Sequence, residues 1–134
     1  MGRLQASGVL PVVAFGLILG LWTWQLLVPH PVPPAVRDEF SPDLLFLASK
    51  LAHAGAYAFL TVLAAALPVS RRQQRLVVAG LLLHAVGTEI GQTFVPNRTG
   101  RVWDVLIDWG GVALGRGVLA LSRRPSAAPP TPPA

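Results

Sequence analysis

The sequence predicts an all-α membrane protein, a four-helix transmembrane bundle with both termini in the cytoplasm. Hydrophobic residues make up 52% of its 134 residues and charged residues 13%, well below the roughly one quarter that is usual in a soluble chain. The apolar residues fall into four blocks of about 20 residues, the length of a helix that crosses a bilayer. This pattern excludes a soluble enzyme domain, and a chain of this length holds one domain.

The four blocks predict transmembrane helices at residues 8–28, 44–67, 76–95 and 103–122. The first block is longer than the apolar part of a cleaved signal peptide and lacks a small-x-small cleavage site, so we expect a membrane anchor. Trp22 and Trp24 near its end are typical of a helix that reaches the membrane interface. Gly16 and Gly20 are two small residues four apart, a spacing that favours close approach of another helix.

Prolines and charges mark the segments between the blocks. Residues 29–43 combine both, which predicts a short extended loop. The second loop contains Arg71, Arg72 and Arg75, and the third begins at Pro96. Residues 1–122 therefore form a single transmembrane domain, and the proline-rich residues 123–134 are expected to be a disordered cytoplasmic tail.

The arginines that flank the helices predict the orientation, because positive charge concentrates on the cytoplasmic side. One side has six of them: Arg3, Arg71, Arg72, Arg75, Arg123 and Arg124. The other side has three: Arg37, Arg98 and Arg101. Both termini should therefore lie in the cytoplasm, and the first and third loops should lie outside.

Polar and ionisable side chains interrupt blocks that otherwise belong in lipid: Lys50, His53, Tyr57, His84, Glu89, Gln92, Asp104 and Asp108. A charge at mid-membrane costs about 2.5–3.5 kcal/mol unless it is paired or faces water. Helical spacing places Lys50, His53 and Tyr57 on one face of the second helix. One stripe of the fourth helix carries Asp104, Asp108, Gly111 and Gly115. Because alternate helices run in opposite directions, we expect the polar residues to meet in the outer half of the bundle.

This polar cluster predicts a substrate, ion or proton site that opens to the outer face. Glu89 and His53 are the candidate catalytic groups, because a carboxylate and an imidazole can exchange protons with a substrate. Arg98 and Arg101 offer forked guanidinium donors above the cluster, which suit a phosphate or another anionic headgroup. The other residues expected to bind the substrate are Lys50, Tyr57, Gln92, Asp104 and Asp108.

Structural roles are the alternative for the same side chains. Lys50, Glu89 and Asp108 could form an ion-pair network that holds the bundle together. Arg98 could pair internally with Asp104 or with Glu89.

The chain shows no signature of a bound cofactor. It has no cysteine, the spacing of its histidines and acids matches no zinc motif, and we expect no metal site. It also lacks a phosphate-binding loop and a dinucleotide fingerprint, so no nucleotide cofactor is expected. The basic residues follow the membrane topology instead of one soluble face, which argues against a nucleic-acid partner. Tyr57 could serve packing alone, through its hydroxyl.

Three motifs run through the polar faces. They are K-x-x-H-x-x-x-Y at residues 50–57, E-x-x-Q at residues 89–92, and an arginine six residues before an acid, continued by two glycines, at Arg98, Asp104, Gly111 and Gly115. In these motifs the chain resembles the VanZ-like family of small bacterial membrane proteins. Where that family usually has asparagine, this chain has Asp108, which adds a carboxyl group. The resemblance implies a multi-pass protein of the bacterial inner (plasma) membrane and cell envelope, with a link to teicoplanin-type glycopeptide resistance.

Three functions compete at this stage. The first is a site in the outer leaflet that binds, or binds and modifies, an anionic lipid or a lipid-linked cell-wall precursor such as a phosphorylated polyprenol. The second is a small proton-coupled transporter, for which four helices are few unless the protein forms a homo-oligomer. The third is a non-catalytic membrane scaffold whose polar core specifies packing.

Overall fold

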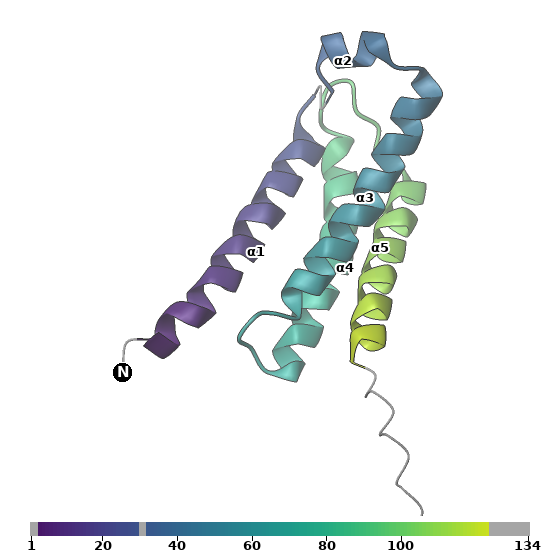
Figure 1. The fold of residues 1–134 in the computed structure, drawn as a ribbon. Coiled ribbons are helices and arrows are strands. Elements are labelled where there is room, and N and C mark those ends of the chain that lie inside the picture. Colours follow the sequence, from purple (N-terminus) through teal and green to yellow (C-terminus); the bar gives the residue numbers. More distant parts are fainter. Residues whose placement is uncertain (1–2, 30–31, 124–134) are drawn as a thin grey trace, which may run out of the picture.

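The protein is all-helical in the computed structural model, which describes residues 3–29 and 32–123, without the side chains of residues 3–7. Five helices follow one another along the chain, and the described residues form no strand (Figure 1). Their bounds are α1 Arg3–Leu27, α2 Pro34–Glu39, α3 Pro42–Ala64, α4 Arg71–Gln92 and α5 Val102–Ser122. The predicted tail lies almost wholly outside the described residues.

The segment predicted to be an extended loop contains a short helix, so that prediction is wrong. Pro34 occupies the first turn of α2, and Pro42 occupies the first turn of α3. Proline is disfavoured in the interior of a helix but suits its first position, where its fixed φ is already helical and no N–H is needed. Ser41 then caps α3, because its side chain accepts a hydrogen bond from the Leu44 N–H.

The arginines expected in the second loop belong to α4, which is a second correction. Ser70 caps this helix, and its side chain accepts from the Gln73 N–H while the Gln73 side chain accepts from the Ser70 N–H. This reciprocal pair is a capping box, and it starts the helix at Arg71, five residues before the predicted span. The sequence contained that signal, but the apolar pattern alone placed the boundary at Leu76.

Three helices are long and apolar enough to cross a membrane: Gly8–Leu27 within α1, α3 and α5. The third predicted span, residues 76–95, lies largely in α4, which does not reach the same apolar content. Arginine and glutamine residues fill its first turns, and His84, Glu89 and Gln92 occupy its second half. The structure therefore supports a membrane protein with three clear spans, and α4 is the polar member of the bundle.

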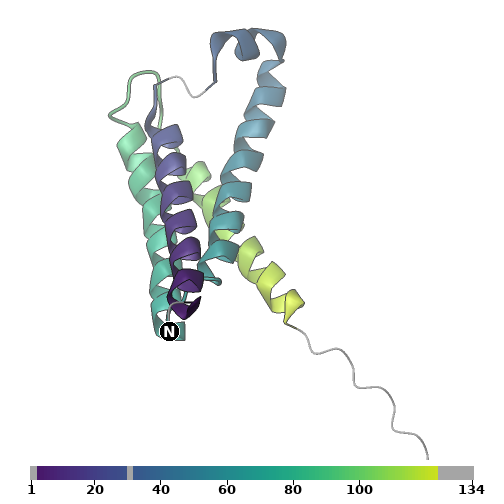
Figure 2. The same cartoon turned by 60° about the vertical axis from the view of Figure 1, so that its left-hand side comes forward.

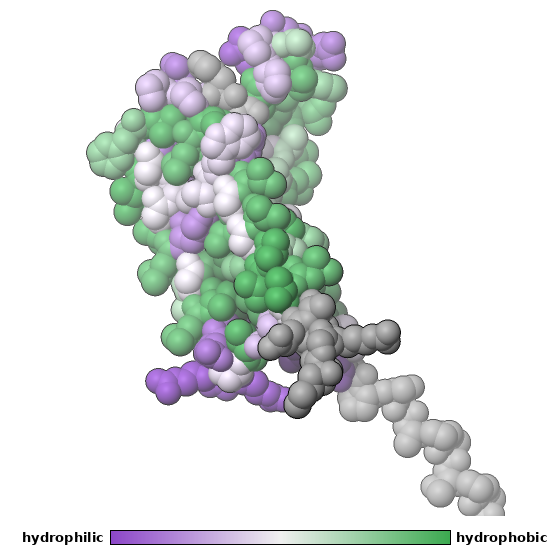
Figure 3. Space-filling model, turned by 90° about the vertical axis from the view of Figure 1, so that its left-hand side faces the viewer, coloured by the Kyte–Doolittle hydropathy of each residue, from purple (hydrophilic) through white to green (hydrophobic). Residues whose placement is uncertain are grey.

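The helices run up and down, so that α1 and α4 end where α3 and α5 begin (Figure 1). We call this the α2 end, since α2 lies across it. On the face shown in Figure 3, most residues between the two ends are hydrophobic, and the largest groups of hydrophilic residues lie at the ends. A surface with an apolar middle and polar ends is what a bilayer requires.

The closest packing joins α3 to α5, which cross each other (Figure 2). A Cβ at Gly111 would collide with the backbone of Ala54, and a Cβ at Gly115 with that of Ala58. The predicted stripe of two acids and two glycines on α5 is thus confirmed as a buried face, and it faces α3. Glycine permits the short distance between the helices that brings the acids into contact with α3.

The helix α1 packs more loosely than the others. Its contacts with the core use Phe15, Ile18, Leu19 and Trp22, which pack against Tyr57, Leu60, Leu81, Ala85 and Val112. A Cβ at Gly16 or Gly20 would meet no described atom within 4 Å. The expected close approach at this glycine pair therefore does not occur within the described chain, because α1 turns its bulky residues to the core.

Candidate functional site

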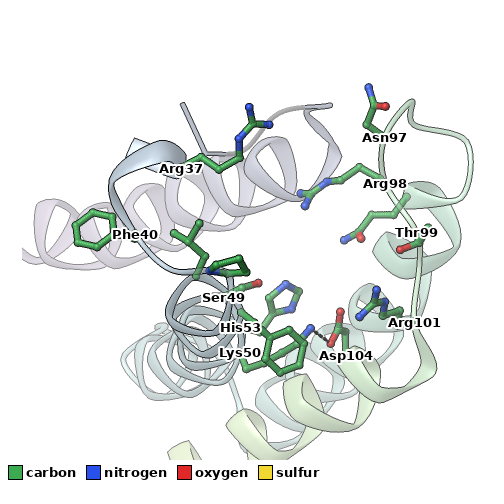
Figure 4. A pocket seen from close by; sticks show the side chains of 14 residues that line it. Arg37, Phe40, Ser49, Lys50, His53, Asn97, Arg98, Thr99, Arg101 and Asp104 are labelled. Carbon is green, nitrogen blue, oxygen red and sulfur yellow. Dashed lines mark hydrogen bonds and ion pairs between the residues drawn. The ribbon is translucent and has the colours of Figure 1, made fainter. Parts of the chain in front are cut away.

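A cavity of about 470 Å³ opens at the α2 end. Its walls come from α2, from the first half of α3, from the loop between α4 and α5, and from the start of α5 (Figure 4). Its lining includes Arg37, Phe40, Phe46, Lys50, His53, Gln92, Arg98, Arg101 and Asp104.

Positive charge dominates this cavity. Arg37, Lys50, Arg98 and Arg101 line it together with a single acid, Asp104, so four basic side chains face one carboxylate. In Figure 4, Arg37 and Arg98 lie across the hollow from the pair of Lys50 and Asp104. Such a site attracts an anion, and arginine offers the forked donors that match phosphate or carboxylate oxygens.

The mouth of the cavity is apolar on one side. Phe40, Pro42, Leu45 and Phe46 belong to its lining, and they lie on α3 or directly before it. Phe40, at 45% exposure, and Phe46, at 56%, present large apolar surfaces outward. A cavity with basic and apolar walls side by side matches an amphiphilic ligand better than a free inorganic anion.

Lys50 and Asp104 form an ion pair between α3 and α5. The Lys50 ammonium also lies 5.0 Å from the centroid of the Phe46 ring, a cation–π contact. Asp104 is 6% exposed, and it lies in the first turn of α5, where a negative charge is favoured by the helix dipole. The pair neutralises the one acid of the cavity, and the net positive charge of the site comes from the arginines.

Below the cavity, α3, α4 and α5 each contribute one buried ionisable residue. His53 Nδ1 and Asp108 Oδ1 are 2.9 Å apart. Glu89 accepts a hydrogen bond of 3.2 Å from Gln92 Nε2 and one of 2.8 Å from the backbone N–H of Arg101. His53 and Gln92 also line the cavity, whereas Glu89 and Asp108 lie behind its wall.

The loop between α4 and α5 is shaped to reach Glu89. Asn97 has φ 61°, the left-handed conformation that asparagine tolerates better than most residues. At Gly100 a Cβ would collide with the backbone carbonyl of Glu89, so only glycine allows this approach. The approach brings the N–H of Arg101 to the Glu89 carboxylate. Asn97 and Gly100 thus give the loop its tight turn.

Arg98 is bound in a way that the sequence did not predict. Its Nη2 donates to the backbone carbonyls of Gln25 and Leu26, 3.1 and 2.8 Å away, at the end of α1. A cation at a helix C-terminus satisfies free carbonyls and is favoured by the helix dipole. Burial lowers the pKa of the Arg98 guanidinium, and nearby Glu89 raises it. Arg98 therefore fastens α1 to the loop, and one edge of its guanidinium is already used.

Tyr57, predicted to bind substrate, belongs to a different group of residues. Its hydroxyl lies 2.8 Å from His84 Nδ1, and His84 Nε2 lies 2.8 Å from the hydroxyl of Thr23. This chain of three side chains joins α3, α4 and α1. Tyr57 is fully buried and does not line the cavity, which matches the packing alternative stated for it.

Sequence reasoning missed Arg37 and Phe40. Both precede the second predicted helix, in the segment expected to be extended, and they reach the cavity because α2 folds across the end of the bundle. The signal that could have found them is Pro34, whose position suits a helix start. Arg37 on this short helix and Phe40 directly after it would then have been candidates for the mouth of the site.

These features define a membrane protein with a basic cavity at one end of its helical bundle and a buried acid–histidine cluster beneath it. The sequence profile of the VanZ/LLP1 family matches residues 13–123. The chain therefore belongs to this family, and the resemblance noted in its motifs is confirmed. Comparison with characterised proteins and with solved structures finds no match.

Proposed function

We propose that this protein is a multi-pass protein of the bacterial inner membrane that binds the anionic headgroup of a lipid or of a lipid-linked cell-wall precursor. A phosphorylated polyprenol has the required chemistry, an anionic headgroup on an apolar chain. The observation that carries the proposal is the cavity at the α2 end, where Arg37 and Arg101 lie beside the apolar residues Phe40 and Phe46. Glycopeptide resistance of the teicoplanin type would follow if the ligand is a cell-wall precursor.

In this proposal the cavity lies in the outer half of the membrane. The opposite end of the bundle carries Arg71, Arg72, Arg75, Arg116 and Arg123, which fits the cytoplasmic side. Four membrane crossings, with α4 as the polar one whose Glu89 and Gln92 are buried, then leave both termini in the cytoplasm. The arginines of the α2 end run against the positive-inside tendency, which supports a ligand-binding role for them.

The four basic residues of the cavity have different roles in the proposed binding of the headgroup. Arg101 is exposed, and its backbone N–H rather than its side chain is held by Glu89. Arg37 forms an exposed ion pair of 3.6 Å with Asp38, which costs little to open. Lys50 is paired with Asp104, and Arg98 is fastened to α1. Arg101 and Arg37 are therefore the main headgroup ligands, and Lys50 and Arg98 shape the site.

The test is native mass spectrometry of the purified protein with undecaprenyl phosphate, phosphatidylglycerol and zwitterionic phosphatidylethanolamine. Arg101→Gln should weaken retention of the anionic lipids by about tenfold or more, since a hydrogen bond to a charged group is worth about 1.5–3 kcal/mol. Arg75→Gln is the matched control, because Arg75 lies at the opposite end. Equal retention of anionic and zwitterionic lipids by the wild type would reject the proposal.

Orientation has its own test, since the chain contains no cysteine. A single cysteine at Thr99, in the loop before α5, should react with a membrane-impermeant maleimide on intact cells. A cysteine at Ser122, at the end of α5, should react only after the membrane is permeabilised. The reverse result would place the cavity on the cytoplasmic side.

A further inference from the structure

His53, Glu89 and Asp108 bring one potential metal ligand each from α3, α4 and α5. Their ligand atoms all lie within 4.8 Å of one another. All three side chains are buried, with exposures of 7%, 4% and 0%. They are 36 and 19 positions apart along the chain, so no spacing motif could reveal that they meet.

The three side chains are held in place by neighbouring groups. Glu89 accepts from the Arg101 N–H and from the Gln92 side chain, and the Trp22 ring meets the His53 ring edge-on at 5.5 Å between centroids. Outer partners of this kind orient metal ligands and maintain affinity in known metal sites. The glycine contacts between α3 and α5 keep the two helices close below the cluster.

The carboxylate oxygens of the cluster can accept more hydrogen bonds than the neighbouring groups donate. Two carboxylates meet a single histidine, and the nearest ammonium group, that of Lys50, is paired with Asp104. Within the described part of the chain, Asp108 Oδ2 is buried and has no hydrogen-bond partner. Two buried carboxylates this close repel each other unless a proton or a cation lies between them. The unsatisfied oxygen belongs to the one side chain of the three that is completely buried.

We propose that His53, Glu89 and Asp108 bind one divalent transition-metal ion of the zinc class. An imidazole with two carboxylates suits zinc, iron or cobalt, whereas magnesium and calcium prefer oxygen ligands alone. Ligand bonds of about 2.0–2.2 Å in a tetrahedral site place the ligand atoms roughly 3.4 Å apart, so the most distant of these atoms would approach each other by up to about 1.4 Å through side-chain rotation. Three protein ligands leave a coordination position open, and His53 connects the cluster to the cavity.

This inference is independent of lipid binding, because it concerns the residues behind the cavity wall. It revises the expectation of no metal site, which rested on the absence of cysteine and on spacing along the chain. In the absence of the metal, a shared proton would have to separate Glu89 and Asp108, and the experiment distinguishes the two cases.

The test is Co²⁺ and Zn²⁺ binding to the purified, tag-free protein, followed by visible absorption of Co²⁺ and by elemental analysis after removal of free metal. The wild type should retain one ion per chain, and Asp108→Asn and Glu89→Gln should each weaken binding by more than about tenfold. His84→Asn is the matched control, because His84 is a histidine of the same bundle that bonds Tyr57 and Thr23, outside the cluster. It should bind the metal like the wild type.

Two results would overturn the proposal. The first is a wild type that retains no Co²⁺ or Zn²⁺, which would indicate a shared proton. The second is metal binding that is equal in wild type, Asp108→Asn and Glu89→Gln, which would indicate adventitious binding elsewhere. The first result needs only the metal stoichiometry of the wild type. The proposal can therefore be rejected even if a variant fails to fold.

Discussion

The two ends of the bundle both hold a basic cavity, and the difference between them is in what lies behind the arginines. At the opposite end, a cavity of about 590 Å³ is lined by Arg71, Arg75, Arg116 and Arg123, with no acid among its lining residues. At the α2 end, the smaller cavity is backed by an ion pair and by buried His53.

Arginines at a cytoplasmic membrane surface need no further explanation than topology. Ionisable groups buried within membrane-spanning helices are costly, and they are usually found where a protein binds or transfers something. The comparison therefore supports the proposal that the α2 end binds the ligand and that the arginines of the opposite end set the orientation. It also shows that positive charge by itself does not identify a site in this protein.

The cavities at both ends depend on the contact between α3 and α5. The largest predicted effect is therefore the loss of both cavities when this contact is broken. Gly111→Leu would force α3 and α5 apart, because a side chain there meets the backbone of Ala54. We expect a loss of about 3 kcal/mol or more in the free energy of unfolding, measured by denaturant titration in detergent micelles.

Gly117→Ala is the matched control for this variant. It lies in the same helix, and a Cβ there would meet no described atom within 4 Å. Alanine should leave stability unchanged or raise it by up to about 1 kcal/mol, since alanine favours the helix. Equal stability of Gly111→Leu and the wild type would show that the close contact does not support the fold.

The next largest effect concerns the α2 end alone, where Lys50 and Asp104 form their ion pair. Lys50→Met leaves Asp104 buried without its partner. Breaking a fully buried pair costs about 3–5 kcal/mol, and this pair is partly exposed, so we expect about 2 kcal/mol of destabilisation. The double variant Lys50→Met with Asp104→Asn should recover most of it, because the unpaired charge is gone. A double variant no more stable than Lys50→Met would contradict this account of the pair.

The smallest predicted effect tests whether Tyr57 belongs to the site. Tyr57→Phe removes the hydroxyl that bonds His84 and should cost about 1–2 kcal/mol of stability, measured by thermal unfolding. Retention of undecaprenyl phosphate should stay at the wild-type level, because Tyr57 does not line the cavity. If Tyr57→Phe is stable but retains less undecaprenyl phosphate than the wild type, Tyr57 takes part in lipid binding after all.

The helical class and the polar faces were predictable from the sequence, because both depend on periodicity along single helices. The stripe from Asp104 to Gly115 is an example, since its four residues repeat with the helical period and share one buried face as expected. The starts of α2 and α4 could have been predicted as well, since Pro34 and the Ser70–Gln73 box mark them.

Contacts between helices were not predictable in the same way. The tether from Arg98 to the end of α1 and the meeting of His53, Glu89 and Asp108 depend on the rotation and tilt of whole helices. A single sequence restricts which face of a helix is polar, but it does not specify which residue of the next helix faces it. Arg98 also shows how one donor can take a structural role instead of the expected role toward a ligand.

The central claim, that the α2 end and not the opposite end binds an anionic lipid headgroup, is tested most directly by single-cysteine protection. Ser49 and Ala120 are both exposed, and each lines one of the two cavities. The rate of maleimide labelling would be measured for Ser49→Cys and Ala120→Cys in micelles, with and without undecaprenyl phosphate. The account predicts slower labelling at position 49 alone. Equal protection at both positions, or protection only at position 120, would contradict it.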